Sequence, residues 1–168
     1  MSFRPTLLIS RCILGEPVRY DGRSKPYPSL VNTLSEHCTL IPLCPEVEAG
    51  LSTPRPPVQL VLKQNQVVAQ GRDDTSLEVT TELQQFSHHY LSQYTTLHGA
   101  VLQNRSPSCG VSDTPLYSPQ QQLLERRDGL FTEQLRQHNP SLLIRSPEQL
   151  NNPAQQSAFV KTLHEKFG

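Results

Sequence analysis

Short apolar runs recur along the chain, and each is bounded by polar or turn-forming residues. Runs of this length are typical of strands buried on both faces of a sheet, because buried helices are usually longer. We therefore predict four strands, at residues 6–10 (TLLIS), 39–43 (TLIPL), 99–103 (GAVLQ) and 141–145 (SLLIR).

The segments between these runs carry apolar residues at helical spacing. Helices are predicted at residues 29–37, from the caps at 74–76 to about 96, at 130–139, and at 153–167 with Asn152 as the N-cap. Residues 58–62 and 66–69 predict a β-hairpin. Residues 44–57 predict a proline-stiffened loop, and no regular structure is predicted for the glutamine-rich stretch 110–127.

Strands that alternate with helices indicate an α/β fold with a mostly parallel sheet. We expect a three-layer, Rossmann-like arrangement, with helices on both faces of the sheet and a small β-hairpin added to it. The length of 168 residues fits a single domain that spans residues 1–168, and neither an internal repeat nor a linker divides it.

The charge balance narrows the classes of partner. Fifteen Lys and Arg residues balance fifteen Asp and Glu residues, which gives a net charge of zero. Proteins that bind DNA through its phosphates are usually basic. No apolar stretch approaches the roughly 20 residues that span a bilayer, and the first run is too short for a signal peptide. We expect a cytoplasmic protein without DNA or membrane partners, in which the four cysteines stay reduced.

Three of the four cysteines follow predicted strands. Cys12 lies just beyond the first strand, Cys44 just beyond the second and Cys109 a few residues beyond the third. Because ligands of an open α/β sheet bind at the carboxyl ends of its strands, we expect these three to form a shared site. Cys38 precedes the second strand and is expected near the opposite edge, as an ordinary thiol.

Three thiolates can hold more than one kind of centre. A catalytic zinc takes three protein ligands and a water, whereas an iron–sulfur cluster held by three cysteines leaves one iron open to a substrate atom. Taken singly, each cysteine is also a common small core residue. The residues alone leave these alternatives open.

Several motifs together resemble one known family. In chain order they are residues 10–15 (SRCILG), 18–22 (VRYDG), 44–46 (CPE), 50–57 (GLSTPRPP), 71–75 (GRDDT) and 105–110 (RSPSCG), with a weaker match at 129–132 (GLFT). This series resembles the family long called domain of unknown function 523 (DUF523), to which the thiouracil desulfidases belong.

The resemblance implies a [4Fe–4S] cluster bound by Cys12, Cys44 and Cys109 as the metal ligands. An open iron of this cluster would take the sulfur of a thiolated pyrimidine similar to 2-thiouracil, and water would complete the conversion to the oxygen analogue. By motif matching, Glu46 and Ser106 would be the catalytic residues that assist proton transfer and water attack.

Both of these residues also have a structural interpretation. Glu46 can instead form an ion pair with Arg55 or Arg105, and the Ser106 hydroxyl can instead stabilise a turn before Pro107.

Five further motif residues are assigned to substrate binding: Arg19, Tyr20, Asp21, Arg55 and Ser108. Tyr20 can stack on a pyrimidine, and Arg55 can bind a carboxylate, a phosphate or a carbonyl oxygen. Asp21 is also a common turn residue.

Two features depart from the family pattern. Arg11 stands where a small residue commonly precedes the first cysteine, and residues 111–127 replace a short glycine-containing turn. If this stretch roofs the pocket, the substrate differs from a free thiobase. A thiolated tRNA is a variant of the small-molecule substrate, supported only by the cationic residues near the first loop.

Two other classes of function are compatible with the residues. A non-catalytic iron–sulfur or metal-binding module would hold the same group but consume no thiobase. A hydrolase with Cys12 or Cys109 as its nucleophile needs a nearby histidine, and none lies in the predicted strand-end loops.

Overall fold

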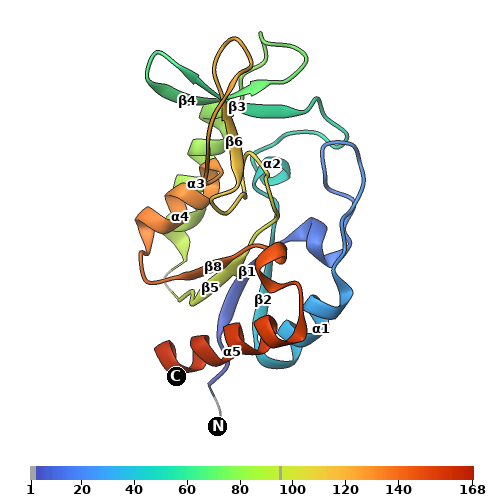
Figure 1. The fold of residues 1–168 in the computed structure, drawn as a ribbon, viewed down its shortest axis with the longest axis vertical. Coiled ribbons are helices and arrows are strands. Elements are labelled where there is room, and N and C mark those ends of the chain that lie inside the picture. Colours follow the sequence, from blue (N-terminus) through green and yellow to red (C-terminus); the bar gives the residue numbers. More distant parts are fainter. Residues whose placement is uncertain (1–2, 95) are drawn as a thin grey trace.

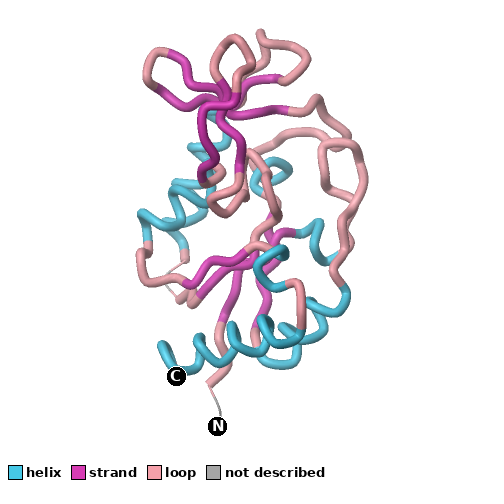
Figure 2. The backbone as a smooth tube through the Cα atoms, in the orientation of Figure 1, coloured by secondary structure: helices cyan, strands magenta, loops and turns pink. Residues whose placement is uncertain are grey.

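The computed structural model describes residues 3–94 and 96–168, which form two four-stranded sheets with helices packed around them (Figures 1 and 2). Sheet A contains, in spatial order, β2 (Thr39–Leu43), β1 (Thr6–Ser10), β5 (Gly99–Val101) and β8 (Leu143–Arg145). Sheet B contains β4 (Gln66–Gly71), β3 (Val58–Lys63), β6 (Thr114–Tyr117) and β7 (Leu123–Arg127). The helices are α1 (Pro28–His37), α2 (Pro45–Glu48), α3 (Thr80–Gln93), α4 (Leu130–His138) and α5 (Pro153–Phe167), with 3₁₀ turns at Arg11–Leu14 and Pro147–Leu150.

Sheet A is parallel throughout, and its strand order creates the place for a site. β1 pairs with β2 on one side and with β5 on the other, and β5 pairs with β8. The order of the strands therefore reverses between β1 and β5. In open α/β sheets such a switch point leaves a crevice at the carboxyl ends of the two strands, so the segments that follow β1 and β5 meet there.

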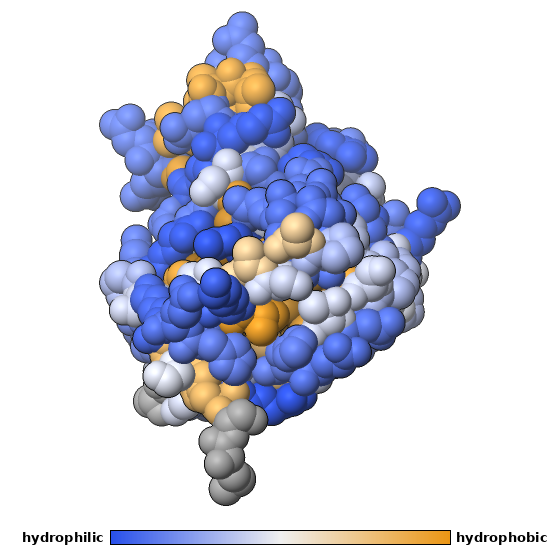
Figure 3. All heavy atoms as spheres, turned by 60° about the horizontal axis from the view of Figure 1, so that its bottom comes forward, coloured by the Kyte–Doolittle hydropathy of each residue, from blue (hydrophilic) through white to orange (hydrophobic). Residues whose placement is uncertain are grey.

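Both faces of sheet A are covered by helices. Successive side chains of β1 point to opposite faces: Leu7 and Ile9 lie in a core cluster with residues of α1 and α5, whereas Leu8 lies in a cluster with residues of α3 and α4. This three-layer arrangement confirms the predicted α/β fold class. The outer side of the molecule near α5 and the chain ends is largely hydrophilic (Figure 3).

Sheet B extends the predicted hairpin and lies at the top of the molecule in Figure 1. The hairpin of β3 and β4 turns through Gln64 and Asn65, whose φ angles of 51° and 64° suit a two-residue turn. Leu60, Leu83 and Leu130 belong to a third core cluster, which joins β3 to α3 and α4. The same two helices therefore pack against both sheets.

The largest difference from the sequence prediction lies in residues 110–127, where no regular structure is predicted. Residues 114–117 pair with β3, which buries Leu116, and β7 then pairs with β6 at the edge of the sheet. Leu123 and Leu124 on this edge are 52% and 48% exposed. Because the first four residues of β7 are exposed, the strand lacks the alternation of apolar and polar residues that identifies a half-buried strand.

Smaller differences have local causes. β2 is an edge strand with mostly accessible residues rather than a strand buried on both faces, and α2 interrupts the predicted loop at 44–57. The third helix begins at Thr80, because the Asp74 carboxylate accepts hydrogen bonds from the backbone N–H and hydroxyl of Ser76 and closes a turn there. It ends at Gln93, before the predicted limit near residue 96 and before Thr95, which lies outside the described residues.

Among residues 3–94 and 96–168, no helix is both long enough and apolar enough to cross a membrane.

Candidate functional site

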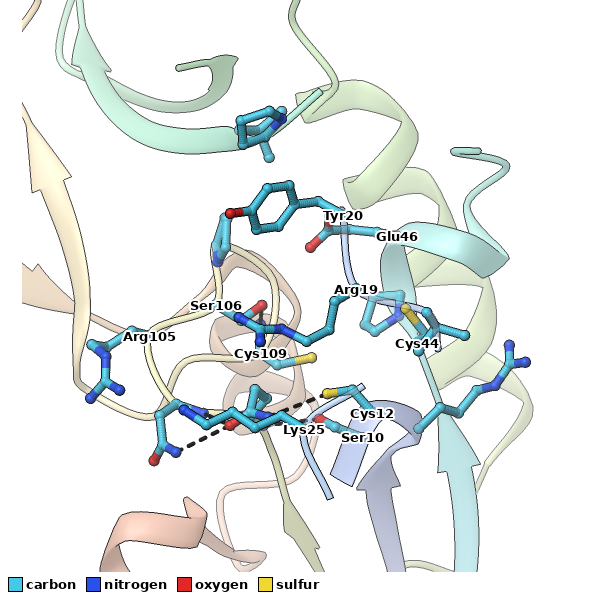
Figure 4. Close-up of a pocket in the computed structure, with 18 of the residues that line it drawn as sticks. Ser10, Cys12, Arg19, Tyr20, Lys25, Cys44, Glu46, Arg105, Ser106 and Cys109 are labelled. Carbon is cyan, nitrogen blue, oxygen red and sulfur yellow. Dashed lines mark hydrogen bonds between the residues drawn. The ribbon is translucent and has the colours of Figure 1, made fainter. Parts of the chain in front are cut away.

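Three cysteines line one cavity at the carboxyl ends of the sheet A strands (Figure 4). Cys12 lies in the 3₁₀ turn after β1, Cys44 lies between β2 and α2, and Cys109 lies in the loop after β5. Cys12 and Cys109 are buried and Cys44 is half-buried, and all three are free thiols. The cavity has a volume of about 290 Å³. The structure thus brings together the three cysteines that the sequence groups.

Cys38 is separated from this cavity by the length of β2. It directly precedes the first residue of that strand, whereas Cys44 follows the last. Its side chain is 1% exposed in the core between β1, α1 and α5, and it is not among the residues that line the cavity.

Burial and mutual charge act on the three clustered thiols. Burial is the main cause that raises the pKa of Cys12, Cys44 and Cys109, and the rise is largest for Cys109. The pKa of Cys109 is also raised by the negative charge of the other two sulfurs, which places all three within electrostatic reach of one another. A cation bound between them would remove this cost, because it would replace the protons on the sulfurs.

The loop that carries Cys109 is shaped by side chains within it. The Ser106 hydroxyl oxygen accepts hydrogen bonds from the backbone N–H groups of Ser108 (3.2 Å) and Cys109 (3.0 Å). Oδ1 of Asp113 accepts from the backbone N–H groups of Arg105 (2.9 Å) and Val111 (3.0 Å), on either side of the cysteine. Ser106 therefore has the structural role that its position before Pro107 suggests, and it also lines the cavity.

The start of α4 docks onto the same loop. The backbone N–H of Leu130 donates to the Pro107 carbonyl (2.8 Å), and that of Phe131 donates to the Ser108 carbonyl (2.9 Å). A Cβ atom on Gly129 would overlap the Ser108 carbonyl and approach the Cys109 nitrogen to 2.7 Å. The weak GLFT match is thus the helix start that supports the Cys109 loop, and its glycine permits the close approach of two backbones.

Glu46 lies in the first turn of α2, two residues after Cys44, and its carboxylate is held on both oxygens. Oε1 accepts from Nε of Arg55 at 3.0 Å, and Oε2 accepts from the hydroxyl of Ser108 at 3.1 Å. The Glu46 and Arg55 side chains are only 13% and 7% exposed. The ion pair with Arg55 is therefore present, and the carboxylate also lines the cavity beside the cysteines (Figure 4).

Arg55 lies in the wall of this cavity and links α2 and the loop after Cys12 to its own loop. Besides the bond to Glu46, its guanidinium donates to the carbonyls of Ser52 and Val18 and to the hydroxyl of Thr53. All three of its guanidinium nitrogens donate to protein acceptors, so its geometry suits the support of Glu46 more directly than the predicted binding of substrate.

The other residues assigned to substrate divide into two pairs. Arg19 and Tyr20 line the cavity, and Arg19 extends into it beside Ser106 (Figure 4). Asp21 is exposed, and its Oδ1 accepts from the backbone N–H of Arg23 at 3.0 Å, as a turn residue does. Ser108 is 1% exposed and faces Glu46, and neither Asp21 nor Ser108 is among the lining residues.

Gln103 and Asn104 also line the cavity with polar groups, and the sequence motifs assign neither of them to the site. Gln103 is the last residue of the predicted strand 99–103, Asn104 directly follows it, and both precede the RSPSCG motif, a position that by itself indicates a place at the sheet edge. No residue of the 111–127 stretch lines the cavity, so in the described structure that stretch does not roof it.

The donor set fits a cluster held by three cysteines. Three free thiols surround a cavity that has room between them, and a carboxylate and polar groups complete its wall. Within the described part of the chain, no three or more His, Cys, Asp or Glu side chains are arranged to hold a single metal ion. No histidine is among the described lining residues, so the partner that a cysteine nucleophile requires is missing from the wall.

Comparisons with known proteins agree with one another. The family model described as 2-thiouracil desulfurase matches residues 7–146. A Bacillus subtilis (strain 168) protein described as "Uncharacterized protein YbbK" is 26% identical over an aligned length of 113, and the match covers 62% of this chain and 72% of that protein. A solved structure of a "[4Fe-4S]-dependent thiouracil desulfidase TudS (DUF523Vcz)" has a TM-score of 0.69 and 29% identity, with 93% of this chain and 99% of that chain covered.

Proposed function

The chain belongs to the 2-thiouracil desulfurase family, and from this premise we propose that it removes sulfur from a thiolated pyrimidine with a [4Fe–4S] cluster held by Cys12, Cys44 and Cys109. The observation that carries the proposal is the convergence of these three thiols on one cavity, with the Glu46 carboxylate in its wall. The similar solved structure, itself a [4Fe–4S]-dependent desulfidase by its description, supports it.

The overall reaction is a hydrolysis without net oxidation or reduction. The carbon–sulfur double bond of the thiocarbonyl is replaced by a carbon–oxygen double bond, one water is consumed, and the sulfur leaves with two protons as hydrogen sulfide. When bound, the cluster supplies a soft iron without a cysteine ligand, which suits the sulfur of a thiocarbonyl.

Side chains of the protein accept and donate the protons of this reaction. Glu46 is the general base that accepts a proton from the attacking water, and its orientation is held by Arg55 and Ser108 on separate oxygens. The Ser106 hydroxyl accepts two backbone N–H groups, so its own proton is the group it can offer to the substrate. The ring of Tyr20 provides an apolar surface on which a pyrimidine can stack.

The charges of the lining favour a substrate that carries a negative group on the thiobase. Among the described lining residues, Glu46 is the one carboxylate. Six cationic side chains line the same cavity: Arg11, Arg19, Lys25, Arg55, Arg72 and Arg105. Salt bridges within the described residues engage four of these cations, but neither Arg19 nor Lys25. These two are the groups that can bind a phosphate next to the base.

The test of the proposal is sulfide release from 2-thiouracil by anaerobically purified, cluster-loaded protein. We expect Glu46→Gln to retain the cluster and to lose roughly 100-fold or more in kcat, the range of general base catalysis. Glu36→Gln, an exposed change on α1, is the matched control and should leave kcat unchanged. Loaded wild-type protein that releases no sulfide from any thiobase would support the non-catalytic module instead.

The form of the substrate is tested with the same assay. The 5′-monophosphate of 2-thiouridine should have a higher kcat/KM than 2-thiouracil, and Arg19→Ala should lower kcat/KM about tenfold for the nucleotide only, which corresponds to about 1.4 kcal/mol. An equal loss for both substrates, or a preference of the wild type for the free base, would contradict the role of the cations.

A further inference from the structure

Gln103 is a buried amide at the switch point between β1 and β5. It lies just beyond β5 and is 7% exposed. Its backbone N–H donates to the hydroxyl of Ser10, the last residue of β1, at 2.9 Å. Its side-chain Nε2 donates to the sulfur of Cys12 at 3.4 Å, a bond drawn as the dashed line that ends at Cys12 in Figure 4. A single residue thus contacts both the end of the neighbouring strand and a sulfur that faces the cavity.

The orientation of the Gln103 amide is determined by its neighbour. Its Oε1 accepts from the backbone N–H of Asn104 at 2.9 Å and from Nδ2 of Asn104 at 3.1 Å. A backbone N–H can only donate, so the oxygen of the Gln103 amide must face Asn104. The NH₂ end of the amide therefore faces Cys12, and it acts as a donor toward the sulfur.

Asn104 in turn is held from outside the cavity. Its Nδ2 donates to the hydroxyl of Tyr27 at 3.2 Å, and its Oδ1 accepts from the backbone N–H of Glu148 at 3.2 Å. Gln103 is consequently the inner member of a hydrogen-bonded series that is anchored before α1 and in the turn before α5. Such support keeps the donor directed at the sulfur.

We propose that Gln103 is a positioning residue that holds Cys12 toward the cluster and raises the reduction potential of the cluster through its N–H···S hydrogen bond. The inference rests on the proposed function, because it requires the cluster. A hydrogen bond to a ligand sulfur withdraws electron density from it and stabilises the cluster with one more electron, so its removal makes reduction harder.

The experiment compares three variants of the full-length protein after anaerobic reconstitution with iron and sulfide. Gln103→Leu removes the donor, whereas Gln103→Glu keeps the shape and the oxygen that accepts from Asn104 but offers no N–H to the sulfur. Gln156→Leu is the matched control, because Gln156 is also buried and donates through Nε2, but to the Leu150 carbonyl away from the cavity. Iron content, melting temperature and the midpoint potential of the cluster are measured for each.

We expect both Gln103 variants to shift the midpoint potential to more negative values, with the larger shift for Gln103→Glu because it adds a negative charge. Gln156→Leu should leave the potential at the wild-type value. Loss of the cluster from Gln103 variants that keep the wild-type melting temperature also supports the positioning role. If Gln103→Leu does not fold, Gln103→Met, which adds no charge and donates no hydrogen bond, decides the outcome.

Unshifted potentials in loaded Gln103 variants, or an equal shift in Gln156→Leu, would overturn this inference and leave the proposed function intact. A wild-type protein that takes up no iron would instead refute the proposed function. The two failures are therefore distinguishable.

Discussion

Burial raises the pKa of Cys38 to about 11, and the nearby Arg4 opposes this only in part. Below the ordinary thiol pKa of 9.0, Cys38 keeps its proton in both the folded and the unfolded chain. The full contribution of the buried neutral thiol to the free energy of unfolding is therefore present there. Between pH 9 and 11 the unfolded chain loses this proton while the folded chain retains it. The free energy of unfolding must therefore fall as the pH rises through this window.

The Cys38→Ala variant tests this expectation in cluster-free protein. From pH 8 to pH 11, wild-type protein should lose about 2 kcal/mol more of its free energy of unfolding than the variant, because a pKa difference of one unit corresponds to about 1.4 kcal/mol. Denaturant unfolding at several pH values measures the difference. Parallel curves for the two proteins would show that Cys38 is not a neutral thiol in the core.

Arg55 is the second residue with a predicted effect on stability. Arg55→Ala leaves the Glu46 carboxylate without its cationic partner in a site where both side chains are largely buried, and it should cost about 3 kcal/mol. Arg72→Ala breaks an exposed pair with Asp73 and should cost less than about 1 kcal/mol. If both changes lower the free energy of unfolding equally, the buried Arg55–Glu46 pair contributes no more to stability than the exposed Arg72–Asp73 pair.

At the residue scale, the sequence predicts which cysteines meet, because Cys12, Cys44 and Cys109 each follow a strand of a parallel sheet. It also offers the Glu46–Arg55 pair as one of two alternatives, since both residues lie in the same proline-rich segment. The contacts of Gln103 and Ser108 are not predictable in this way. They join segments 91 and 62 residues apart, and they depend on the strand order and on where α2 begins.

Among the elements, the start of α4 is predicted to matter for cluster binding. Gly129→Ala should push the loop of Cys109 away from α4, at a cost of about 1–3 kcal/mol for overpacking, and should lower the iron content of the protein. Gln137→Ala, on the exposed side of α4, changes the same helix without touching the loop and should keep full iron content. The iron content and the melting temperature are measured for both variants. A Gly129→Ala protein with full iron would show that the contact between α4 and the Cys109 loop is not needed for cluster binding.

The sequence predicts well those elements that have a clear apolar run or a capping residue of their own. β1 and β2 have the predicted bounds, and α5 has its Asn152 cap, whose Oδ1 accepts from the backbone N–H of Gln155. β6 and β7 are missed because their pairing depends on β3, more than 50 residues earlier, and not on their own pattern. α2 is missed because a four-residue helix is too short to show a period.

For the whole molecule, we propose that residues 1–168 behave as a single domain. α3 and α4 contribute to the core clusters of both sheets, so neither sheet keeps its core when the other unfolds. Thermal unfolding should therefore be one cooperative transition, with far-ultraviolet and near-ultraviolet circular dichroism changing together. Two separate transitions would show that sheet B forms an independent unit.

Cys12, Cys44 and Cys109, without Cys38, are the proposed ligands of the [4Fe–4S] cluster. The most direct test is the iron and sulfide content of anaerobically reconstituted wild-type protein and of the four single Cys→Ser variants. We predict about four irons per chain in the wild type and in Cys38→Ser, and a marked loss in the other three variants. Wild-type protein that stays colourless, or a loss that is as large in Cys38→Ser as in the others, would show that these three cysteines do not hold the cluster.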